Sequence, residues 1–384
     1  MKVEQVYQIA NALTQEYIGE TEVLSEDLSN IVDIGKATIG LANLDKYVNS
    51  LIDHIGKVVF VNRPYSGKTP SLMMDGWEYG AILEKISYDG LPEAEENLSW
   101  ELEDGVSYDP NIFTKPSVSA KFFSKKVTFD IPMSFAERQV KMAFDNPQQL
   151  NAFFSMIYNA IEKSMTVKMD SLAQRALNNM IGITLNSANP MRAVNLLTKY
   201  KAATGNNTLT ADKAVYDPEF IRYTSLLLKL YAERMQRLSK LFNDSGKERF
   251  TSPDMLHVIL LSEFAAAAEA YLQSDTYHNE FVSLPKAETV PYWQGSGTGY
   301  AFTSTSKIDV TVNTGTSPLP TVEQTGILGV MFDHYAVGVA NLDRRVTSNY
   351  NGRAEFYNNW YKFDAGYFND PDENFVVFYV ADAN

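Results

Sequence analysis

Apolar residues change their spacing along this chain, and each spacing predicts a different kind of element. In residues 1–56 they recur every three or four positions, as at Val6, Ile9 and Leu13, which indicates helices. The same segment has three lysines against nine acidic residues and little contiguous apolar surface. It is compatible with a flexible arm, an arm packed on a partner, or part of a core.

From residue 57 the spacing favours strands. Residues 57–61 form a β-branched run, and apolar residues alternate with polar ones over 77–84 and again over 126–131. The stretch 89–116 between them shows neither period, which is unusual inside a compact domain. The simplest geometry is an elongated two-stranded arm. Because such an arm is only marginally stable in water by itself, we expect it to lie on another surface.

The strongest helix signal begins at Pro147. Asp145 and Asn146 supply capping groups, apolar residues then recur at three- and four-residue steps, and Gly182 is the predicted stop. A helix over 147–182 would be about 54 Å long at 1.5 Å per residue. An element of this length needs an extended partner, such as a sheet or a neighbouring subunit.

The second half of the chain mixes helices and strands. Asp217 and Pro218 cap a predicted helix that closes at 243–246, and Ser262 caps another over 263–273. Strands are predicted at 257–261, 308–312, 330–339 and 375–380. Together these elements predict an α+β protein.

Composition narrows the classes of function. The chain has 33 basic and 47 acidic residues, a net charge of −14, whereas nucleic-acid binders need a basic surface. It has no cysteine, which excludes disulfides, thiolate metal sites and cysteine nucleophiles, and it has only four histidines. No uncharged apolar run reaches about 18 residues, so we expect no membrane span.

Three motifs are similar to ligand-binding loops, but each lacks an essential feature. Residues 63–69 end in Gly-Lys-Thr like a phosphate-binding loop, yet Asn62 stands where the first glycine is needed. Residues 295–299 have the glycine spacing of a dinucleotide loop but no helix-forming sequence behind them. Residues 370–374 lack the alternating oxygen ligands of a calcium loop and predict a turn before the last strand. We therefore expect no cofactor and no metal.

Two charged groups lie on either side of the predicted turn of the arm. The acidic group precedes the turn and the basic group lies on the returning strand. The candidate contact residues in these groups are Glu95, Glu96, Glu101, Glu103, Lys121, Lys125 and Lys126. They either form two solvated faces or meet opposite charges on neighbouring subunits, where they would set register more than affinity.

The order of elements resembles a known family. A short arm, a long hairpin and a very long helix precede a mixed domain and a late strand. The likeness is strongest at 191–200 and in the C-terminal stretch formed by 326–336, 354–360 and 372–378, and residues 252–260 are also similar. The chain resembles the major capsid protein of tailed bacteriophages, whose fold is named after Hong Kong phage 97 and is shared with encapsulins. These stretches are packing signatures and carry no catalytic residues.

The resemblance implies a division of the chain into five parts. They are an N-terminal arm, an extended β-hairpin loop, a peripheral domain with the spine helix, an axial domain, and a return to the peripheral domain. The corresponding residues are 1–56, 57–130, 131–200, 201–340 and 341–384.

The resemblance also implies a function. The subunits would form pentamers and hexamers of an icosahedral shell that encloses phage DNA without sequence-specific binding, with scaffolding, portal or decoration proteins as candidate partners. The chain would be made in the host cytoplasm, reside in the virion, contact no membrane, hold no cofactor and catalyse no reaction. An encapsulin-like nanocompartment shell is the alternative on the same fold. A carboxylate-based hydrolase is a further alternative, because acids are plentiful although nothing selects one pair.

Three predicted elements point to self-assembly without the resemblance. The arm of two strands, the polar helical arm of residues 1–56 and the oversized helix are elements that one copy leaves incomplete. They indicate head-to-tail contacts between copies, and such contacts form rings when the rotation closes.

Overall fold

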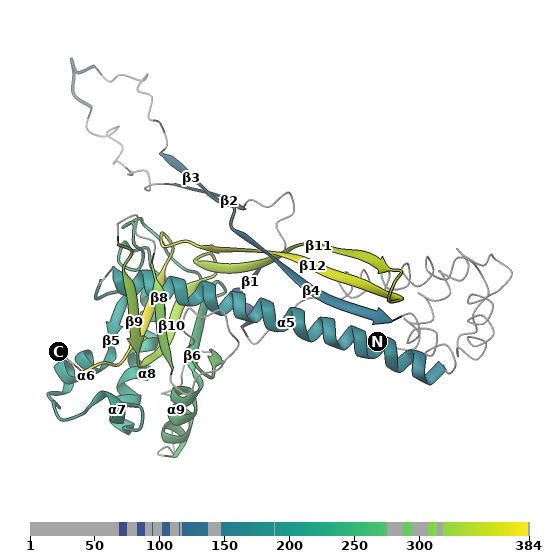
Figure 1. Cartoon of the computed structure of the whole chain (residues 1–384). Helices are drawn as coiled ribbons and strands as arrows, with labels where there is room; N and C mark the ends of the chain where they lie inside the picture. Colours follow the sequence, from purple (N-terminus) through teal and green to yellow (C-terminus); the bar gives the residue numbers. More distant parts are fainter. Residues whose placement is uncertain are drawn as a thin grey trace.

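The structure is a computed structural model that describes residues 69–74, 83–88, 94, 102–107, 115, 117–136, 147–187, 189–274, 287–293, 306–312 and 318–382. The predicted helices of 1–56, the strand at 57–61 and the loops at 63–68 and 295–299 lie outside these residues. Figure 1 shows two sheets alongside one long helix, and a separate hairpin that extends away from them.

The strands form two sheets and two hairpins. The four-stranded sheet has the order β1-β11-β12-β4, and the five-stranded sheet has the order β5-β13-β10-β6-β7. The pairs β2–β3 and β8–β9 are separate antiparallel units. The strands are β1 Met73–Met74, β2 Leu83–Tyr88, β3 Val118–Phe123, β4 Lys126–Ala136, β5 Ala193–Asn195, β6 Leu256–Leu261, β7 Glu288–Val290, β8 Lys307–Thr311, β9 Thr321–Thr325, β10 Ile327–Asp333, β11 Val337–Asn351, β12 Phe356–Asn369 and β13 Phe375–Tyr379. The helices are η1 Pro70–Leu72, a 3-10 turn, and α5 Pro147–Asn186, α6 Leu196–Thr204, α7 Ala211–Ala214, α8 Pro218–Met235 and α9 Ser262–Ser274.

Helix α5 runs along both sheets. In Figure 1 its N-terminal half lies beside β4, β11 and β12, and its C-terminal end reaches the five-stranded sheet. Its inward residues, among them Ile161 and Met169, are fully buried in the common core. The predicted long helix is confirmed, and the two sheets of its own chain supply an extended surface for it.

The predicted stop at Gly182 is wrong, because α5 continues to Asn186. A Cβ atom at Gly182 would lie 3.2 Å from a methyl carbon of Val312 and 3.3 Å from Cβ of Val310. The glycine therefore lets β8 and the residue after it pack closely on the helix. Glycine ends helices through its backbone freedom, but at this position its small size is what the fold uses.

The five-stranded sheet contains fully buried strands. β10 pairs antiparallel with β13 on one side and with β6 on the other, and all seven of its residues are buried. Continuous apolar runs are typical of strands that are covered on both faces. The strands predicted at 257–261, 308–312 and 375–380 are confirmed as β6, β8 and β13, and the helix predicted at 263–273 is confirmed as α9.

The prediction of one strand over 330–339 is wrong. β10 ends at Asp333, β11 begins at Val337, and the two strands belong to different sheets. The Asp333 carboxylate accepts a hydrogen bond from the Tyr335 N–H (2.9 Å), and the Asp333 carbonyl accepts one from the Ala336 N–H (2.8 Å). These bonds form a turn that takes the chain from one sheet into the other.

Helix α8 is shorter than predicted. It begins after Asp217, whose carboxylate accepts a hydrogen bond from the Phe220 N–H at 2.8 Å, but it ends at Met235. Phe242 continues the apolar spacing of the helix in the sequence, but it lies in the loop after α8, and its side chain is buried in the core. Its ring packs edge-on against Tyr231 with 5.9 Å between centroids. The period continues past the helix because the loop folds back onto the same core.

Candidate functional site

The β2–β3 hairpin stands apart from both sheets (Figure 1). Its strands pair antiparallel in a register that runs from Leu83↔Phe123 to Tyr88↔Val118. A two-stranded arm is therefore present, although residues 77–82 of its predicted first strand lie outside the described residues. The strand predicted at 126–131 is confirmed as β4, but its place in the arm is wrong, because β4 pairs with β12. Side chains alternate across a strand, so the hairpin has two distinct faces.

One face of the hairpin is apolar and exposed. This outer face consists of Glu84, Ile86, Val118, Ala120 and Phe122. Ile86 is 66% exposed, Phe122 64% and Val118 50%. Neighbouring apolar side chains at this exposure are typical of a surface that binds another molecule.

The opposite, inner face carries two lysines directly across from each other, Lys85 and Lys121. Like charges at such positions repel, and acidic residues compensate them here. Lys85 Nζ lies 2.7 Å from the Asp370 carboxylate and 2.7 Å from that of Glu373. Lys121 Nζ lies 3.0 Å from Asp370 and also forms an ion pair with Asp372. Charges thus attach the hairpin to the turn between β12 and β13.

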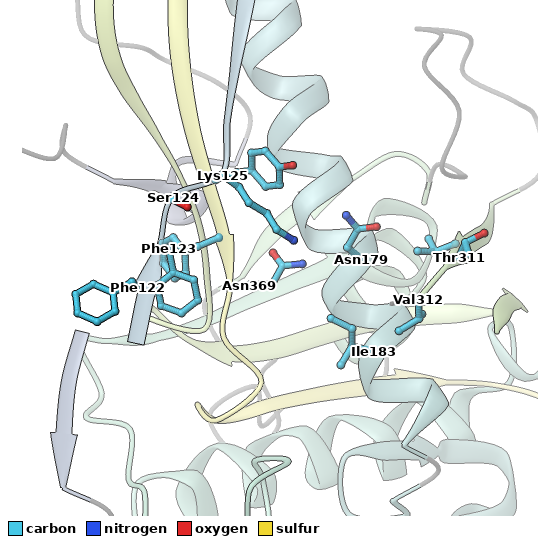
Figure 2. Close-up of a pocket in the computed structure, with 12 residues that line it drawn as sticks. Phe122, Phe123, Ser124, Lys125, Asn179, Ile183, Thr311, Val312 and Asn369 are labelled. Carbon is cyan, nitrogen blue, oxygen red and sulfur yellow. The ribbon is translucent and has the colours of Figure 1, made fainter. Parts of the chain in front are cut away.

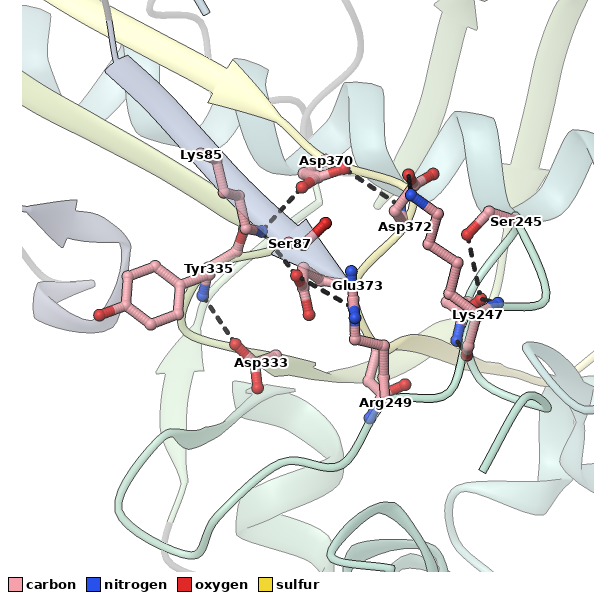
Figure 3. Close-up of polar contacts among 12 residues, drawn as sticks. Lys85, Ser87, Ser245, Lys247, Arg249, Asp333, Tyr335, Asp370, Asp372 and Glu373 are labelled. Carbon is pink, nitrogen blue, oxygen red and sulfur yellow. Dashed lines mark hydrogen bonds and ion pairs between the residues drawn. The ribbon is translucent and has the colours of Figure 1, made fainter. Parts of the chain in front are cut away.

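Two more cations reach the same acidic turn from the loop between α8 and β6. Lys247 Nζ lies 3.4 Å from Asp372, and Arg249 Nε lies 3.5 Å from Glu373. Figure 3 shows the acids between the hairpin strand and this loop. We call the whole group the ionic cluster; its members are Lys85, Lys121, Lys247, Arg249, Asp370, Asp372 and Glu373.

The pKa values of two acids of the ionic cluster shift in opposite directions. Burial by itself would raise the pKa of Asp370, but the two hairpin lysines outweigh it and hold that pKa below the ordinary value. Burial also raises the pKa of Glu373, and there Lys85 and Arg249 offset it only in part, so the net change is upward. Of these two carboxylates, Glu373 is therefore the one that takes up a proton at the higher pH.

A cavity of about 490 Å³ lies at the base of the hairpin (Figure 2). Its walls come from the corner between β3 and β4, from α5, from β8 and from the end of β12. The Phe123 ring packs on Phe368 with 5.3 Å between centroids, and Lys125 lines the cavity. Its described lining contains no Asp, Glu or His, so it offers no acid–base pair.

A second cavity, of about 470 Å³, is lined in part by acidic residues and histidines. The Glu288 carboxylate accepts hydrogen bonds from the Ser71 N–H (3.0 Å) and the Ser71 hydroxyl (2.7 Å), which attaches η1 to β7. The His257 and His334 rings lie 5.3 Å apart, and burial followed by the charge of His334 lowers the pKa of His257. These contacts join chain segments and point to a structural role.

The structure places some of the predicted contact residues. Glu95, Glu96 and Glu101 lie outside the described residues, and Glu103 is exposed. Lys121 belongs to the ionic cluster, so acids of its own chain meet its charge. Lys125 lines the first cavity, and Lys126 is exposed at the start of β4. Their contact with a neighbouring subunit stays a prediction.

Sequence reasoning misses most of the ionic cluster. The turn predicted at 370–374 is confirmed, but its sequence does not reveal that its acids bind Lys85 and Lys121, which lie 285 and 249 positions from Asp370. The sequence offers one signal: each hairpin strand has a lysine, Lys85 or Lys121, among the residues of its inner face.

In the part of the chain that the structure describes, no helix is long and apolar enough to cross a lipid bilayer. Nor do the described His, Asp and Glu residues form a group of three or more that could hold a metal ion.

A comparison with protein families identifies the chain. A family model described as Phi29-like phage major capsid protein matches residues 6–379. The chain belongs to this family. A Phi29-like major capsid protein is a structural component of the virion, and the capsid fold implies assembly into pentamers and hexamers. The predicted function as a major capsid protein is confirmed.

Solved structures of phage capsids are similar to this chain in fold. The capsid structure of Staphylococcus phage Andhra aligns with a TM-score of 0.52 and 9% identity, covering 84% of this chain and 86% of that chain. The capsid structure of the Cyanophage P-SCSP1u aligns with a TM-score of 0.43 and 10% identity, covering 84% of this chain and 90% of that chain. No curated protein sequence matches the chain. At 9% identity the similarity to the Andhra capsid supports the fold alone, and the predicted α+β capsid fold is confirmed.

Proposed function

We propose that this major capsid protein forms its pentamers and hexamers through the outer face of the β2–β3 hairpin. The asymmetry of the hairpin carries this proposal. Lys85 and Lys121 bind its inner face to its own chain, while Ile86 and Phe122 remain about two-thirds exposed on the outer face. A hairpin held in this way cannot turn its apolar face inward. In a shell, the surface always available to cover it is another copy of the chain.

Such a contact joins two different surfaces, a hairpin on one copy and a body on the next. Contacts between unlike surfaces propagate from copy to copy and close into rings when the rotation permits. Rings of five and six would then tile an icosahedral shell. The charged residues Glu95, Glu96, Glu101, Glu103, Lys125 and Lys126 would help to set the register between copies. Lys121 would instead hold the hairpin to its own chain through Asp370 and Asp372.

We also propose that the wall encloses DNA without reading its sequence. A net charge of −14 per chain repels phosphate, so the wall would not bind the packaged genome tightly. The role is structural and not enzymatic. A basic inner wall in an assembled particle would contradict this part of the proposal.

The remaining parts of the proposal concern assembly in the cell. The chain would be synthesised in the host cytoplasm and meet scaffolding, portal or decoration proteins there. Its parts would be an arm (1–56), a hairpin loop (57–130), a peripheral domain (131–200), an axial domain (201–340) and a peripheral return (341–384). The masses of particles assembled with and without a co-expressed scaffold candidate would test the need for a scaffold.

The central experiment compares the wild type with Ile86→Asp, and uses Leu226→Asp as the control. Leu226 on α8 is 65% exposed, which matches Ile86, but it lies outside the hairpin. In sedimentation and negative-stain microscopy we expect shells or rings for the wild type and the control. Ile86→Asp should remain a monomer of 43.1 kDa, because a charge at the centre of an apolar contact stays unpaired. A wild type that stays monomeric at high concentration, or an Ile86→Asp variant that assembles normally, would contradict the proposal.

A further inference from the structure

The loop between α8 and β6 carries a second exposed apolar surface. Ser239 and Arg249 form an antiparallel bridge across this loop, with backbone hydrogen bonds of 2.9 and 3.0 Å in the two directions. The flanking positions face the opposite side, where Leu238 is 50% and Phe250 58% exposed. Leu241, next to the bridge, is 51% exposed. We call these three apolar residues the loop patch.

By this alternation Leu238 and Phe250 lie on the side of the bridge opposite Arg249, just as the outer face of the hairpin lies opposite Lys85 and Lys121. Arg249, on the inward side of the bridge, pairs with Glu373, and Lys247 pairs with Asp372. Figure 3 shows the acidic residues between the strand of Lys85 and the segment of Lys247 and Arg249. One ionic cluster therefore holds two short two-stranded pieces by their charged sides and leaves the apolar sides of both exposed.

Within one chain these two apolar surfaces cannot cover each other. Each is fixed by the ion pairs behind it, and the acidic turn lies between them. Both surfaces are small and of similar size, with three large apolar side chains each. Both keep exposures of 50% or more in the single chain.

We propose that the loop patch is the docking site for the outer hairpin face of a second copy of this chain. This inference rests on the proposed function, because it names the surface that the hairpin would meet. Charge supports the pairing. Glu84 is exposed on the outer hairpin face across from Phe122, and the exposed Arg237 adjoins the loop patch next to Leu238. The neighbouring Lys240 already pairs with Glu248 of its own chain at 3.4 Å. An acid beside one apolar surface and a base beside the other favour this match over hairpin on hairpin.

The arrangement has a consequence for assembly. Each copy gives one hairpin and receives one, so the contact forms a ring and not a closed dimer. The same ionic cluster positions the donating and the receiving surface. Its geometry therefore sets the angle between neighbouring copies.

Crosslinking tests the docking directly, because the chain has no cysteine of its own. A variant with Ile86→Cys and Phe250→Cys is assembled and treated with a short bismaleimide. On a denaturing gel we expect a ladder that ends at the ring sizes, because residue 86 of one copy meets residue 250 of the next. Each single variant should give no dimer. The pair Ile86→Cys with Leu226→Cys, of matched exposure, should give none either.

The outcomes separate the docking from the proposed function. Shells that form but give no ladder, or the same ladder in the Leu226→Cys control, would overturn the docking and leave the proposed function intact. A wild type that forms neither shells nor rings would overturn both. A ladder that requires both cysteines supports the docking.

A charge exchange gives an independent test. Glu84→Lys and Arg237→Glu should each lower the assembled fraction about two- to fivefold, the range of an exposed ion pair. The double variant should recover most of the loss, because the pair is restored with reversed sign. If the fold decrease in the double variant equalled the product of the two single decreases, the two residues would act independently, and a contact between them would be contradicted.

Discussion

Strands β6 and β3 both have six residues, and their surroundings differ in an instructive way. β6 lies between β10 and β7 in the five-stranded sheet, and its last four residues are buried. β3 has one neighbour, β2, and its residues alternate between exposed and half-buried. The sheet is completed by residues of the same chain. The hairpin is completed on its inner face only, and Ile86, Val118 and Phe122 are left at least half exposed on its outer face.

The two regions also depend on different forces. The sheet is held by apolar burial, which is worth about 25 cal/mol per Å² and does not respond to pH. The hairpin is held by ion pairs in which Lys85 is 19% and Lys121 36% exposed. Interactions of partly exposed charges weaken in salt and depend on protonation. Variants and pH should therefore separate the two regions.

The largest effect is expected in the sheet. Phe332 on β10 is fully buried and packs against Phe375 and His257 with centroid distances of 5.7 and 5.8 Å. Phe332→Ala leaves a cavity and should lower the free energy of unfolding by about 3–5 kcal/mol. Urea unfolding measures it, with the exposed Leu226→Ala as a control that should change little. A loss of less than about 1 kcal/mol for Phe332→Ala would mean that the sheet relaxes around the cavity.

The next largest effect concerns the attachment of the hairpin. The Asp370 side chain is 2% exposed and binds both hairpin lysines. Asp370→Asn leaves those lysines without this charge and should cost about 1–3 kcal/mol. In hydrogen exchange the amides of β2 and β3 should lose protection while those of β10 keep theirs. Asp343→Asn is the control, because the Asp343 side chain is 73% exposed in its pair with Arg345. Unchanged protection in β2 and β3 would show that the cluster does not hold the hairpin.

A smaller effect, of opposite sign, is expected at Glu373. Its pKa is raised because burial outweighs its cations, so its ionised form costs folding free energy at neutral pH. Glu373→Gln removes that cost and should increase the free energy of unfolding at pH 7 by up to about 1 kcal/mol. A marked loss of stability at pH 7 would contradict the raised pKa.

The pH dependence of the two acids should also differ. The advantage of Glu373→Gln should shrink as the pH falls through the raised pKa of Glu373 and vanish below its ordinary value of 4.5. The stabilising contribution of Asp370 is present above its ordinary value of 3.8 and is lost only below it, as the pH falls through the lowered pKa. Urea unfolding of both variants between pH 7 and pH 3 compares them in one series. If the difference in unfolding free energy between variant and wild type disappeared at the same pH for both variants, the predicted difference between the two carboxylates would be contradicted.

Sequence patterns predict the sheet better than the hairpin, for a physical reason. The continuous apolar runs at 257–261 and 375–380 indicate strands that are buried on both faces, and a run of this kind can be recognised from neighbouring residues in the sequence. Helix α5 is likewise predicted from the spacing of its apolar residues. The wrong helix ends occur where packing against a segment distant in the sequence determines the structure. Gly182 does not end α5 because β8 packs on it, and Phe242 lies in a loop that returns to the core.

The ionic cluster is harder to predict. Its members come from β2, β3, the loop after α8 and the turn after β12, and the pair Lys85–Asp370 spans 285 positions. Nothing in the neighbourhood of either residue indicates the other. The candidate acids Glu95, Glu96 and Glu101 follow from a charge run, which is visible in sequence. The acids that bind Lys121 lie instead in a turn whose sequence predicts only the turn.

The smallest effect on folding is expected where the effect on assembly is largest. Ile86 is 66% exposed and lies on the face of the hairpin that does not bind the chain's own body. Ile86→Asp should change the free energy of unfolding by less than about 0.5 kcal/mol, as exposed substitutions do. The measurement is urea unfolding at a concentration where the wild type is monomeric, because assembly adds apparent stability. Unimpaired folding together with lost assembly would show that the apolar residues of the hairpin act between copies. A loss comparable with that of Phe332→Ala would instead place Ile86 in the folded core and remove the contrast between the two regions.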